Sequence, residues 1–414
     1  MKQQPDDLKQ IASFEESHEF NEFAQREQDL SSVPGFINPY FIPHDSALRD
    51  TSIFEGREVL NFGSYNYVAM SGDPEVNQAA IDAIDQYGTS ASGSRLLAGE
   101  KTIHRELEQT IAQWKHTEDA IVLVSGHATN VSFVGNICGP KDLILYDLLS
   151  HNSIAEGIRL SRSDARPFGH NNIKGLESIL KNNRHKYEKV LIIIEGVYSM
   201  DGDIAPVPEF VRLKKEYGCM LMVDEAHSAG VIGEHGGGVD DYFGLAPDDV
   251  DIKMGTLSKA LGTCGGYLAG SAGLIHYLRY NLPGFVFSVG LSPPLAAASM
   301  KAVEILQREP ERVQRLHQNI EFFSSEAKRL GFDMNRAKGT AILPIVTGRD
   351  DLTLELSMRM LGEGISVPPA LYPAVPRNKG RLRFCVNSLH TEEEITMALE
   401  TLKRLMDDLT DHDE

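Results

Sequence analysis

The feature that most constrains the fold is a series of uninterrupted apolar segments that alternate with amphipathic segments between residues 120 and 270. These segments predict strands at 120–124, 142–146, 189–195, 219–224, 252–255 and 267–270. Strands that are apolar throughout are buried on both faces, and the helices between them let neighbouring strands run parallel. The sequence therefore predicts an α/β fold with a mostly parallel sheet that helices cover on both faces.

Further elements are predicted before and after this sheet in the sequence. Aromatic residues at helical spacing (Phe14, Phe20 and Phe23) predict an N-terminal helix, and further helices are predicted at 74–87 and 102–114. After residue 292 the pattern predicts helices at 295–308, 310–330 and 352–362, strands at 341–346 and 382–386, and a last helix from 392. We therefore expect an N-terminal segment (1–60), a large domain (61–295) and a smaller α+β C-terminal domain (296–414).

Charge and cysteine content argue against several classes of protein. The 414 residues include 40 lysines and arginines against 59 aspartates and glutamates, a net charge of −19, which argues against nucleic-acid or anionic-membrane binding. No apolar run approaches the ~18 residues of a membrane span, and the first residues lack a signal-peptide pattern. The four cysteines are far apart, and no His/Cys group has metal-ligand spacing. We expect a reduced cytoplasmic protein with no metal site.

Lys259 is the first candidate for chemistry. It follows the strand predicted at 252–255, in the run Met254-Gly-Thr-Leu-Ser-Lys-Ala-Leu-Gly. Most lysines are solvated surface residues, but this one lies among small and apolar neighbours. Desolvation there favours the neutral amine, which can form a Schiff base with an aldehyde.

A carboxylate at the end of another predicted strand makes the indication of a functional site more specific. Asp224 closes the apolar run 219–224 and is followed by His227 in Val223-Asp-Glu-Ala-His-Ser. A lysine for the aldehyde and a carboxylate for the ring nitrogen are what pyridoxal 5′-phosphate (PLP) requires. Taken alone, Asp224 is equally well explained as the N-cap of a following helix.

Several other polar residues also follow predicted strands. Ser125, His151, Glu195 and Asp224 all lie at or just beyond a strand's carboxyl end. In parallel α/β sheets the ligand binds outside these ends. We therefore expect these residues to share one crevice with Lys259.

Six runs, in order along the chain, resemble the α-oxoamine synthase family of fold-type I PLP enzymes, which includes serine palmitoyltransferase and 8-amino-7-oxononanoate synthase. The resemblance extends from about residue 61 to 391. The runs are Gly63-Ser-Tyr-Asn-Tyr, Gly93-Ser-Arg-Leu-Leu-Ala-Gly, Glu195-Gly-Val-Tyr-Ser-Met-Asp-Gly-Asp, Val223-Asp-Glu-Ala-His-Ser, Thr256-Leu-Ser-Lys and Arg381-Leu-Arg-Phe. One such run would be weak evidence, but six in the family's order are specific.

The resemblance implies a role for each residue around the cofactor ring. Lys259 would hold PLP and later move the Cα proton of the substrate, and Asp224 would pair with the ring nitrogen. His151 would stack on the ring face, while His227 and Ser199 would contact the region of the phenolic oxygen. A lone histidine or a turn serine is usually structural, so these last roles depend on the motifs.

The phosphate and the second subunit are also implied. Gly126 and His127, which open a helix after Ser125, would offer backbone N–H groups to the phosphate, and Thr256 would offer its hydroxyl. Without the family, the Ser-Gly turn is equally a bare helix cap. The family usually has an aromatic residue at the position of His127. Ser288 matches a residue that reaches the phosphate of the neighbouring subunit, which implies a homodimer.

The substrate side includes one match and one departure. Arg383 matches the family's arginine that binds the amino acid carboxylate in bidentate geometry, and Tyr65 and Asn66 lie where relatives place substrate-side polar groups. Without the resemblance, Arg383 would be a surface arginine on an exposed strand. Several relatives carry a second arginine in an Arg-Pro-Pro segment, but Leu371 occupies that position here. We therefore expect amino acid recognition to differ from that of serine palmitoyltransferase.

The reaction that the resemblance implies is a decarboxylative Claisen condensation of an amino acid with an acyl thioester, which gives an α-amino ketone. An aminotransferase is the first alternative, although aminotransferases of this fold commonly carry tyrosine at the position of His227. A non-catalytic subunit of a serine palmitoyltransferase-like complex is the second, and such a subunit would lack Lys259.

The acyl donor is a separate question. The runs Ser125-Gly-His-Ala-Thr-Asn, Val289-Gly-Leu-Ser-Pro-Pro and Tyr372-Pro-Ala-Val-Pro are most similar to members of polyketide and acyl-carrier-protein pathways. An acyl carrier protein (ACP) is therefore the expected donor, with acyl-CoA as the alternative. We look for the donor among the bases Arg159, Arg162 and Arg166.

Overall fold

The computed structural model describes residues 11–31 and 38–410, and the chain forms two compact units, Met1–Ile42 and Pro43–Glu414. In the first unit, a 3₁₀ turn (Phe14–Glu16) precedes helix α1 (His18–Ser31). The ring of Phe20 contacts those of Phe14 and Phe23, with centroids 6.0 and 6.3 Å apart. The predicted N-terminal helix is confirmed, although Phe14 lies in the turn before it.

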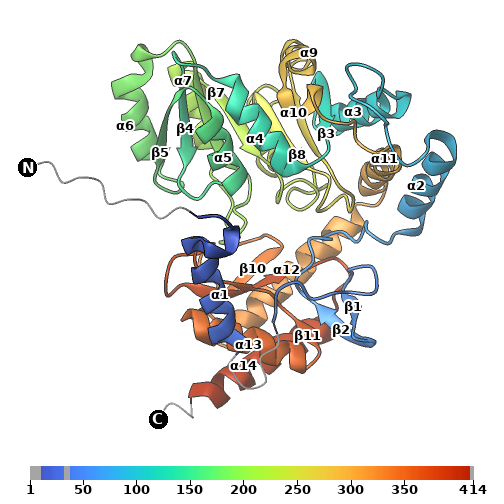
Figure 1. Ribbon diagram of the computed structural model, residues 1–414, viewed down its shortest axis with the longest axis vertical. Helices are drawn as coiled ribbons and strands as arrows, with labels where there is room; N and C mark the ends of the chain where they lie inside the picture. Colours follow the sequence, from blue (N-terminus) through green and yellow to red (C-terminus); the bar gives the residue numbers. More distant parts are fainter. Residues whose placement is uncertain (1–10, 32–37, 411–414) are drawn as a thin grey trace, which may run out of the picture. The chain divides into compact units, whose positions relative to one another are not determined.

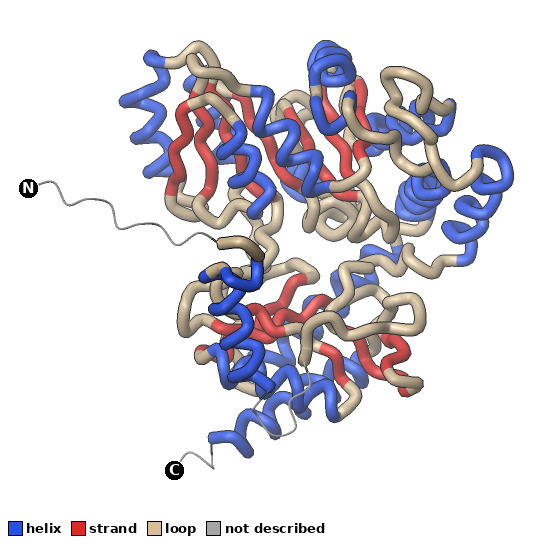
Figure 2. The backbone as a smooth tube through the Cα atoms, in the orientation of Figure 1, coloured by secondary structure: helices blue, strands red, loops and turns tan. Residues whose placement is uncertain are grey.

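The second unit, which we call the body, is built on a seven-stranded sheet (Figures 1 and 2). In spatial order its strands are β3 (Asp119–Leu123), β9 (Gly266–Gly270), β8 (Ile252–Thr256), β7 (Met220–Asp224), β6 (Val190–Glu195), β4 (Leu143–Asp147) and β5 (Asp164–Phe168). Strand β9 runs antiparallel to both of its neighbours, β3 and β8, and the other pairings in this sheet are parallel. The predicted α/β fold is confirmed, and all the predicted strands of this sheet are present.

Two apolar cores, one on each face, explain why these strands are apolar throughout. In β6, Ile192 and Ile194 belong to one core, while Leu191 and Ile193 belong to the other. Helices α4, α5, α9 and α10 contribute side chains to the second core, whereas α3, α6 and α7 contribute to the first. Each strand therefore buries both of its faces, as the sequence predicts.

The helices of the body differ in length, and not all of them lie on the seven-stranded sheet (Figure 1). They are α2 (Pro74–Tyr87), α3 (Thr102–Trp114), α4 (Gly126–Ile137), α5 (Asn152–Leu160), α6 (Ile173–Asn183), α7 (Val207–Tyr217), α8 (Val239–Phe243), α9 (Ala272–Asn281), α10 (Pro283–Val286), α11 (Pro293–Arg308), α12 (Glu311–Arg329), α13 (Asp350–Gly362) and α14 (Glu392–Thr410); a 3₁₀ turn spans Arg184–Lys186.

Two three-stranded sheets complete the body. One contains β10 (Ile342–Gly348), β13 (Gly380–Cys385) and β12 (Pro369–Ala370), all antiparallel. The other pairs the hairpin β1 (Thr51–Phe54) and β2 (Arg57–Asn61) with β11 (Ile365–Ser366), so residues from the start and the end of the body lie side by side (Figure 1). The sequence boundaries at 61 and 296 stay a prediction.

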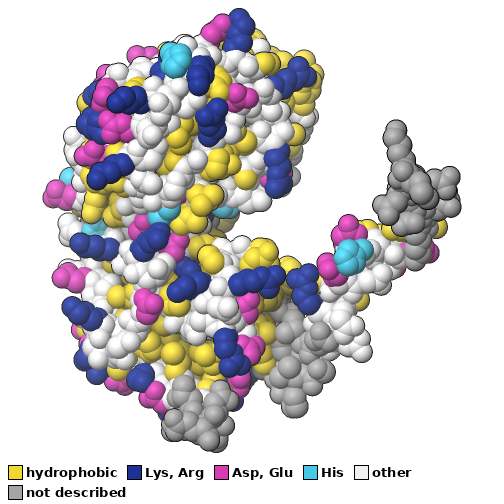
Figure 3. Space-filling model, turned by 90° about the vertical axis from the view of Figure 1, so that its left-hand side faces the viewer, with side chains coloured by type: hydrophobic (Ala, Val, Ile, Leu, Met, Phe, Trp, Pro, Cys, Tyr) yellow, Lys and Arg dark blue, Asp and Glu magenta, His cyan; other side chains and the backbone are white. Residues whose placement is uncertain are grey.

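The described residues include no helix long and apolar enough to cross a membrane and no group of His, Cys, Asp or Glu side chains arranged to hold a metal ion. All four cysteines are free. On the face in Figure 3, positive and negative side chains are interspersed, and the body is hollowed between its two lobes, with histidines at the inner edge.

Candidate active site

A cavity of about 140 Å³ lies at the carboxyl edge of the seven-stranded sheet. Its lining residues are Gly126, His127, Asn130, His151, Ser153, Glu195, Asp224, Ala226, His227, Met254, Thr256 and Lys259. They come from the ends of β6, β7 and β8 and from the starts of α4 and α5. As expected, His151, Glu195 and Asp224 share this crevice with Lys259, whereas Ser125 is not among its lining residues.

Lys259 lies three residues beyond the end of β8 and reaches into this cavity. Burial lowers the pKa of its amine to about 8, against the opposing effect of the Asp224 carboxylate. Its Nζ is 2.7 Å from Nε2 of His227 and 5.7 Å from the centre of the Tyr65 ring. Near pH 8 a large fraction of this amine is therefore neutral and able to attack an aldehyde.

Asp224 ends β7 directly beside Glu195, which ends β6. One carboxylate oxygen of Asp224 accepts from the Ala226 N–H (2.9 Å) and the other from Nδ2 of Asn130 (2.7 Å). No salt bridge in the described part of the chain involves Asp224, and no helix begins after it, so the N-cap alternative is wrong. Burial, reinforced by Asp224, raises the pKa of Glu195 well above its usual value.

His227 connects the lysine to a buried tyrosine. Its Nδ1 is 2.9 Å from the hydroxyl of Tyr67, and its Nε2 bonds to Lys259. Burial first, and then the charges of Lys259 and Arg383, lower the pKa of His227 well below its usual value. The imidazole is therefore neutral, and it holds the lysine amine without adding charge to the site.

The start of α4 fits a phosphate group. Ser125 caps this helix by accepting from the Ala128 N–H, and both Gly126 and His127 line the cavity. A Cβ on Gly126 would lie 2.9 Å from Oγ1 of Thr256, so only glycine lets the first turn approach β8 this closely. The first N–H groups of a helix have no partner within it and attract anions.

These features fit PLP, the cofactor that the sequence predicts. Asp224 is a buried anion with an open side toward the cavity, Lys259 offers an amine of lowered pKa, and the first turn of α4 offers N–H donors. The ring of His151 also lies in the cavity wall, 6.4 Å from that of His127 at 82°. A cationic ring nitrogen, an aldehyde and a phosphate would each find a complementary group here.

A second cavity of about 530 Å³ shares Lys259 with the first. Its other lining residues are Ser46, Ala47, Leu48, Gly63, Ser64, Tyr65, Asn66, Ser71, Ser258, Gly262 and Thr263. Lys259 is the only charged residue in this lining, in which hydroxyl groups are prominent. A molecule bound in the second cavity could therefore reach Lys259 without meeting another charged side chain in the lining.

The remaining predicted residues occupy different positions. Arg383 is buried on β13, where Nε donates to the carbonyl of Ser199 (2.7 Å) and the guanidinium lies 5.0 Å from the centre of the Tyr65 ring, so the surface-arginine alternative is wrong. The Asn66 amide bonds to the backbone of Leu48 and Ser71. The roles of Arg383, Tyr65 and Asn66 toward the substrate stay predictions, as does the role of Ser199 toward the cofactor.

Two further predictions concern residues outside both cavities. Ser288 lies between two exposed apolar residues, Phe287 and Val289, and lines neither cavity. Arg159, Arg162 and Arg166, the bases suggested for the acyl donor, line neither cavity either; Arg159 pairs with Glu156, and Arg166 bonds to Asn183.

Some site residues were not identified from the sequence. Asn130, Ser153 and Tyr67 all bond to predicted site residues. Asn130 lies four residues after Gly126 and therefore on the same side of α4, which is the one signal that could have identified it. Tyr67 is 160 residues from His227 in the chain, so no local pattern connects them.

A charged cluster braces the loops around the site. Nδ1 of His170 contacts Asp147 at 3.0 Å and Nε2 contacts Asp203 at 2.8 Å, and the Asp147 loop leads into His151. Although burial alone would lower the pKa of His170, its hydrogen bonds to Asp147 and Asp203 raise it to about 9. The imidazolium therefore joins two loops at neutral pH.

We expect the His170→Gln variant to be less stable than the wild type by about 3 kcal/mol at pH 6. Because the folded pKa exceeds the unfolded value, the contribution is complete below pH ~6.5 and is lost as pH rises through about 9. Urea unfolding curves of the holoenzyme at pH 6 and pH 9.5 measure this difference. Exposed His185→Gln is the control, and an equal deficit at both pH values would contradict the interpretation.

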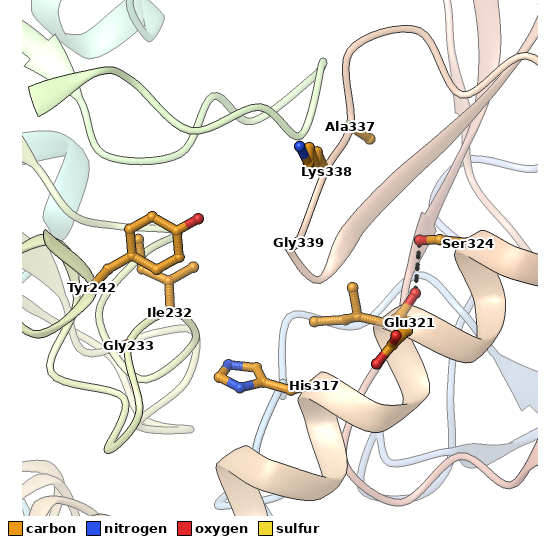
Figure 4. A pocket seen from close by; sticks show the side chains of 10 residues that line it. Ile232, Gly233, Tyr242, His317, Glu321, Ser324, Ala337, Lys338 and Gly339 are labelled. Carbon is orange, nitrogen blue, oxygen red and sulfur yellow. Dashed lines mark hydrogen bonds between the residues drawn. The ribbon is translucent and has the colours of Figure 1, made fainter.

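A third pocket, of about 440 Å³, lies elsewhere in the body (Figure 4). Its lining comes from the 232–242 segment on one side and from α12 and the 337–339 loop on the other. His317 in its wall donates from Nε2 to the carbonyl of Val231 at 2.7 Å. None of the residues singled out from the sequence lies there, so we place the chemistry at Lys259.

Comparisons with known proteins identify the family of the chain. A model described as aminotransferase class I and II matches residues 57–402. The chain is 41% identical over 360 residues to 8-amino-7-oxononanoate synthase of Symbiobacterium thermophilum, covering 87% of this chain and 91% of that protein. Serine palmitoyltransferase of Sphingomonas wittichii gives a TM-score of 0.90 at 31% identity over 96% of this chain and 99% of that one. A structure described as SPT with PLP gives a TM-score of 0.89 at 29% identity, and the match covers 94% of this chain and 98% of that one.

Proposed function

This chain belongs to the aminotransferase class I and II family as a PLP-dependent α-oxoamine synthase, and we propose that it condenses an amino acid with an acyl thioester carried by ACP. The products would be an α-amino ketone, CO2 and the free thiol. The observation that carries this proposal is the convergence of Lys259, His227 and Asp224 on one cavity. The second cavity, which opens on the same lysine, provides space for the acyl donor.

When bound, PLP supplies an aldehyde and a ring that accepts the electron pair left behind when a proton leaves the amino acid Cα. Asp224 would keep a proton on the ring nitrogen, since a buried carboxylate beside a cation stabilises its charge. The first turn of α4, with Gly126 and His127, would bind the phosphate, and the Thr256 hydroxyl at the cavity wall would assist.

Lys259 would hold the cofactor at rest and act as the base during reaction. Its lowered pKa makes Nζ able to accept a proton near neutral pH, and the bond to Nε2 of His227 keeps Nζ in place. Arg383 would bind the substrate carboxylate, since its guanidinium lies beside the Tyr65 ring. The guanidinium and the lysine amine both lie near the Tyr65 ring, 5.0 and 5.7 Å from its centre.

The proposed active form is a homodimer in which Ser288 reaches the phosphate of the partner's cofactor. The exposure of Phe287, at 87%, supports this, because a second copy would cover an apolar side chain that flanks Ser288. Light scattering of the holoenzyme tests this part of the proposal, and a monomeric mass would contradict it.

The relatives' name suggests where to begin the search for the amino acid. In 8-amino-7-oxononanoate, the carbon that bears the amino group is followed by one terminal carbon. Alanine leaves such a pattern when it loses its carboxylate, so alanine is the first amino acid to test.

The experiment measures thiol release by the holoenzyme with each proteinogenic amino acid and with matched acyl-ACP and acyl-CoA. We expect one amino acid to be strongly preferred and kcat/KM for acyl-ACP to be at least about tenfold higher, a difference of ~1.4 kcal/mol. Equal or better use of acyl-CoA would reverse the donor assignment. Formation of a keto acid without thiol release would indicate an aminotransferase instead.

A further inference from the structure

A chain of hydrogen bonds connects Asp224 to His151 through two residues without an assigned role. Nδ2 of Asn130 lies 2.7 Å from Oδ2 of Asp224 and 3.0 Å from Oγ of Ser153. Ser153 in turn contacts Nδ1 of His151 twice, through its hydroxyl at 2.7 Å and its backbone N–H at 3.2 Å. Asn130, Ser153 and Asp224 are buried, so the bonds among these three have little competition from water, whereas His151 at the end of the chain is exposed.

The direction of every bond in this chain is determined. A backbone N–H can only donate, so Nδ1 of His151 carries no hydrogen and accepts. The Ser153 hydroxyl, which is 2.7 Å from the same nitrogen, must then donate its proton to it. The hydroxyl oxygen is left to accept from Asn130, and the other amide hydrogen of Asn130 goes to the carboxylate of Asp224.

The consequence for His151 is a single tautomer. With two donors on Nδ1, a neutral ring carries its hydrogen on Nε2. Burial lowers the pKa of His151, which keeps the ring neutral. The ring lines the cavity, so its Nε2–H is a donor available to a ligand there.

We propose that Asn130 and Ser153 are positioning residues that hold His151 as the Nε2–H tautomer and align its ring with the Asp224 carboxylate. Asn130 does both with one amide group, because its two hydrogens are shared between Asp224 and Ser153. The inference rests on the proposed function only in assuming that a substrate or cofactor meets the His151 ring. The arrangement of the bonds themselves is independent of the reaction.

The test is to read the tautomer of His151 directly. Long-range ¹H–¹⁵N correlation spectra of ¹⁵N-histidine-labelled holoenzyme distinguish a protonated Nε2 from a protonated Nδ1, and a His151→Gln sample assigns the signal. We expect the Nε2–H form in the wild type. A protonated Nδ1 in the wild type would overturn the proposal without any need for a variant.

Two variants on different helices test the chain of hydrogen bonds from Asp224 through Asn130 and Ser153 to His151, which we call the relay. Losing one hydrogen bond is worth a change of roughly fivefold to tenfold in an equilibrium. We therefore expect Ser153→Ala and Asn130→Ala each to shift the tautomer ratio by about that factor toward Nδ1–H. The control is Asn136→Ala, an exposed asparagine on the same helix as Asn130, which should leave the ratio unchanged. An unchanged ratio in the folded Ser153→Ala and Asn130→Ala proteins would contradict the proposal.

A second readout separates a positioning role from a structural one. We expect Ser153→Ala to raise the amino acid Kd about tenfold, measured from the cofactor absorbance, with the urea midpoint changed little. If the wild type shows the expected tautomer but catalyses no condensation, the proposed function fails and the relay stands. If condensation proceeds normally in both variants with unchanged Kd, the relay has no role in positioning.

Discussion

The Lys259→Ala variant is expected to lose at least about a thousandfold in the rate of α-amino ketone formation. Alanine removes the amine that we propose both to hold the cofactor and to take the Cα proton. No other lysine lines either cavity that meets at this position. The measurement is kcat with saturating amino acid and acyl donor, together with the absorbance of the PLP-supplied protein.

The absorbance separates a loss of chemistry from a loss of folding. The band of lysine-bound PLP should be present in the wild type and absent from the variant, while both unfold at similar urea concentrations. The control is Lys181→Ala, an exposed lysine on α6. A Lys259→Ala protein that kept a tenth of wild-type activity would remove this lysine from the mechanism.

The Asp224→Asn variant is expected to lose about tenfold to a thousandfold in kcat. An opposite charge at contact distance shifts a pKa by 1–3 units, and each unit corresponds to ~1.4 kcal/mol. An amide of the same size retains the packing, but it has one oxygen where Asp224 uses two, so it can accept from the Ala226 N–H or from Asn130 but not from both, and it cannot hold a proton on the ring nitrogen by charge. The loss should therefore appear mainly in kcat, with stability lowered only by the ~1 kcal/mol of one hydrogen bond.

The matched control is Asp248→Asn, an exposed residue in the loop before β8, which should behave as the wild type. Steady-state kinetics and urea unfolding of both variants make the comparison. A fully active Asp224→Asn enzyme would mean that the buried carboxylate has a structural role only.

The fold could be predicted where its sequence signals are local. Helices α2 and α3 have the predicted bounds, and α2 begins with a capping aspartate, Asp73, and a proline at its first position. The strands of the main sheet were recognisable because burial on both faces leaves an uninterrupted apolar run. The prediction missed β5, whose Asp-Ala-Arg-Pro-Phe sequence has no such run. It pairs only with β4, and a proline is tolerated on an edge strand.

Contacts between distant parts of the chain were beyond local reasoning. The hairpin β1–β2 pairs with β11 about three hundred residues later, and no feature of residues 51–61 specifies that partner. At the site, the strand-end rule predicted the convergence of Asp224, Lys259 and His151. It could not identify Ser153 or Tyr67, because their roles depend on side-chain distances of 2.7–2.9 Å that the tertiary fold sets.

The measurement that tests the central claim most directly is the ratio of CO2 to free thiol released by the wild-type holoenzyme. Carboxyl-labelled amino acid and an acyl thioester are supplied together, and both products are followed in the same reaction. A decarboxylative condensation predicts one CO2 for each thiol, with no CO2 when either substrate is omitted. Thiol release without CO2, or conversion of the amino acid to a keto acid in the absence of the thioester, would contradict the assignment.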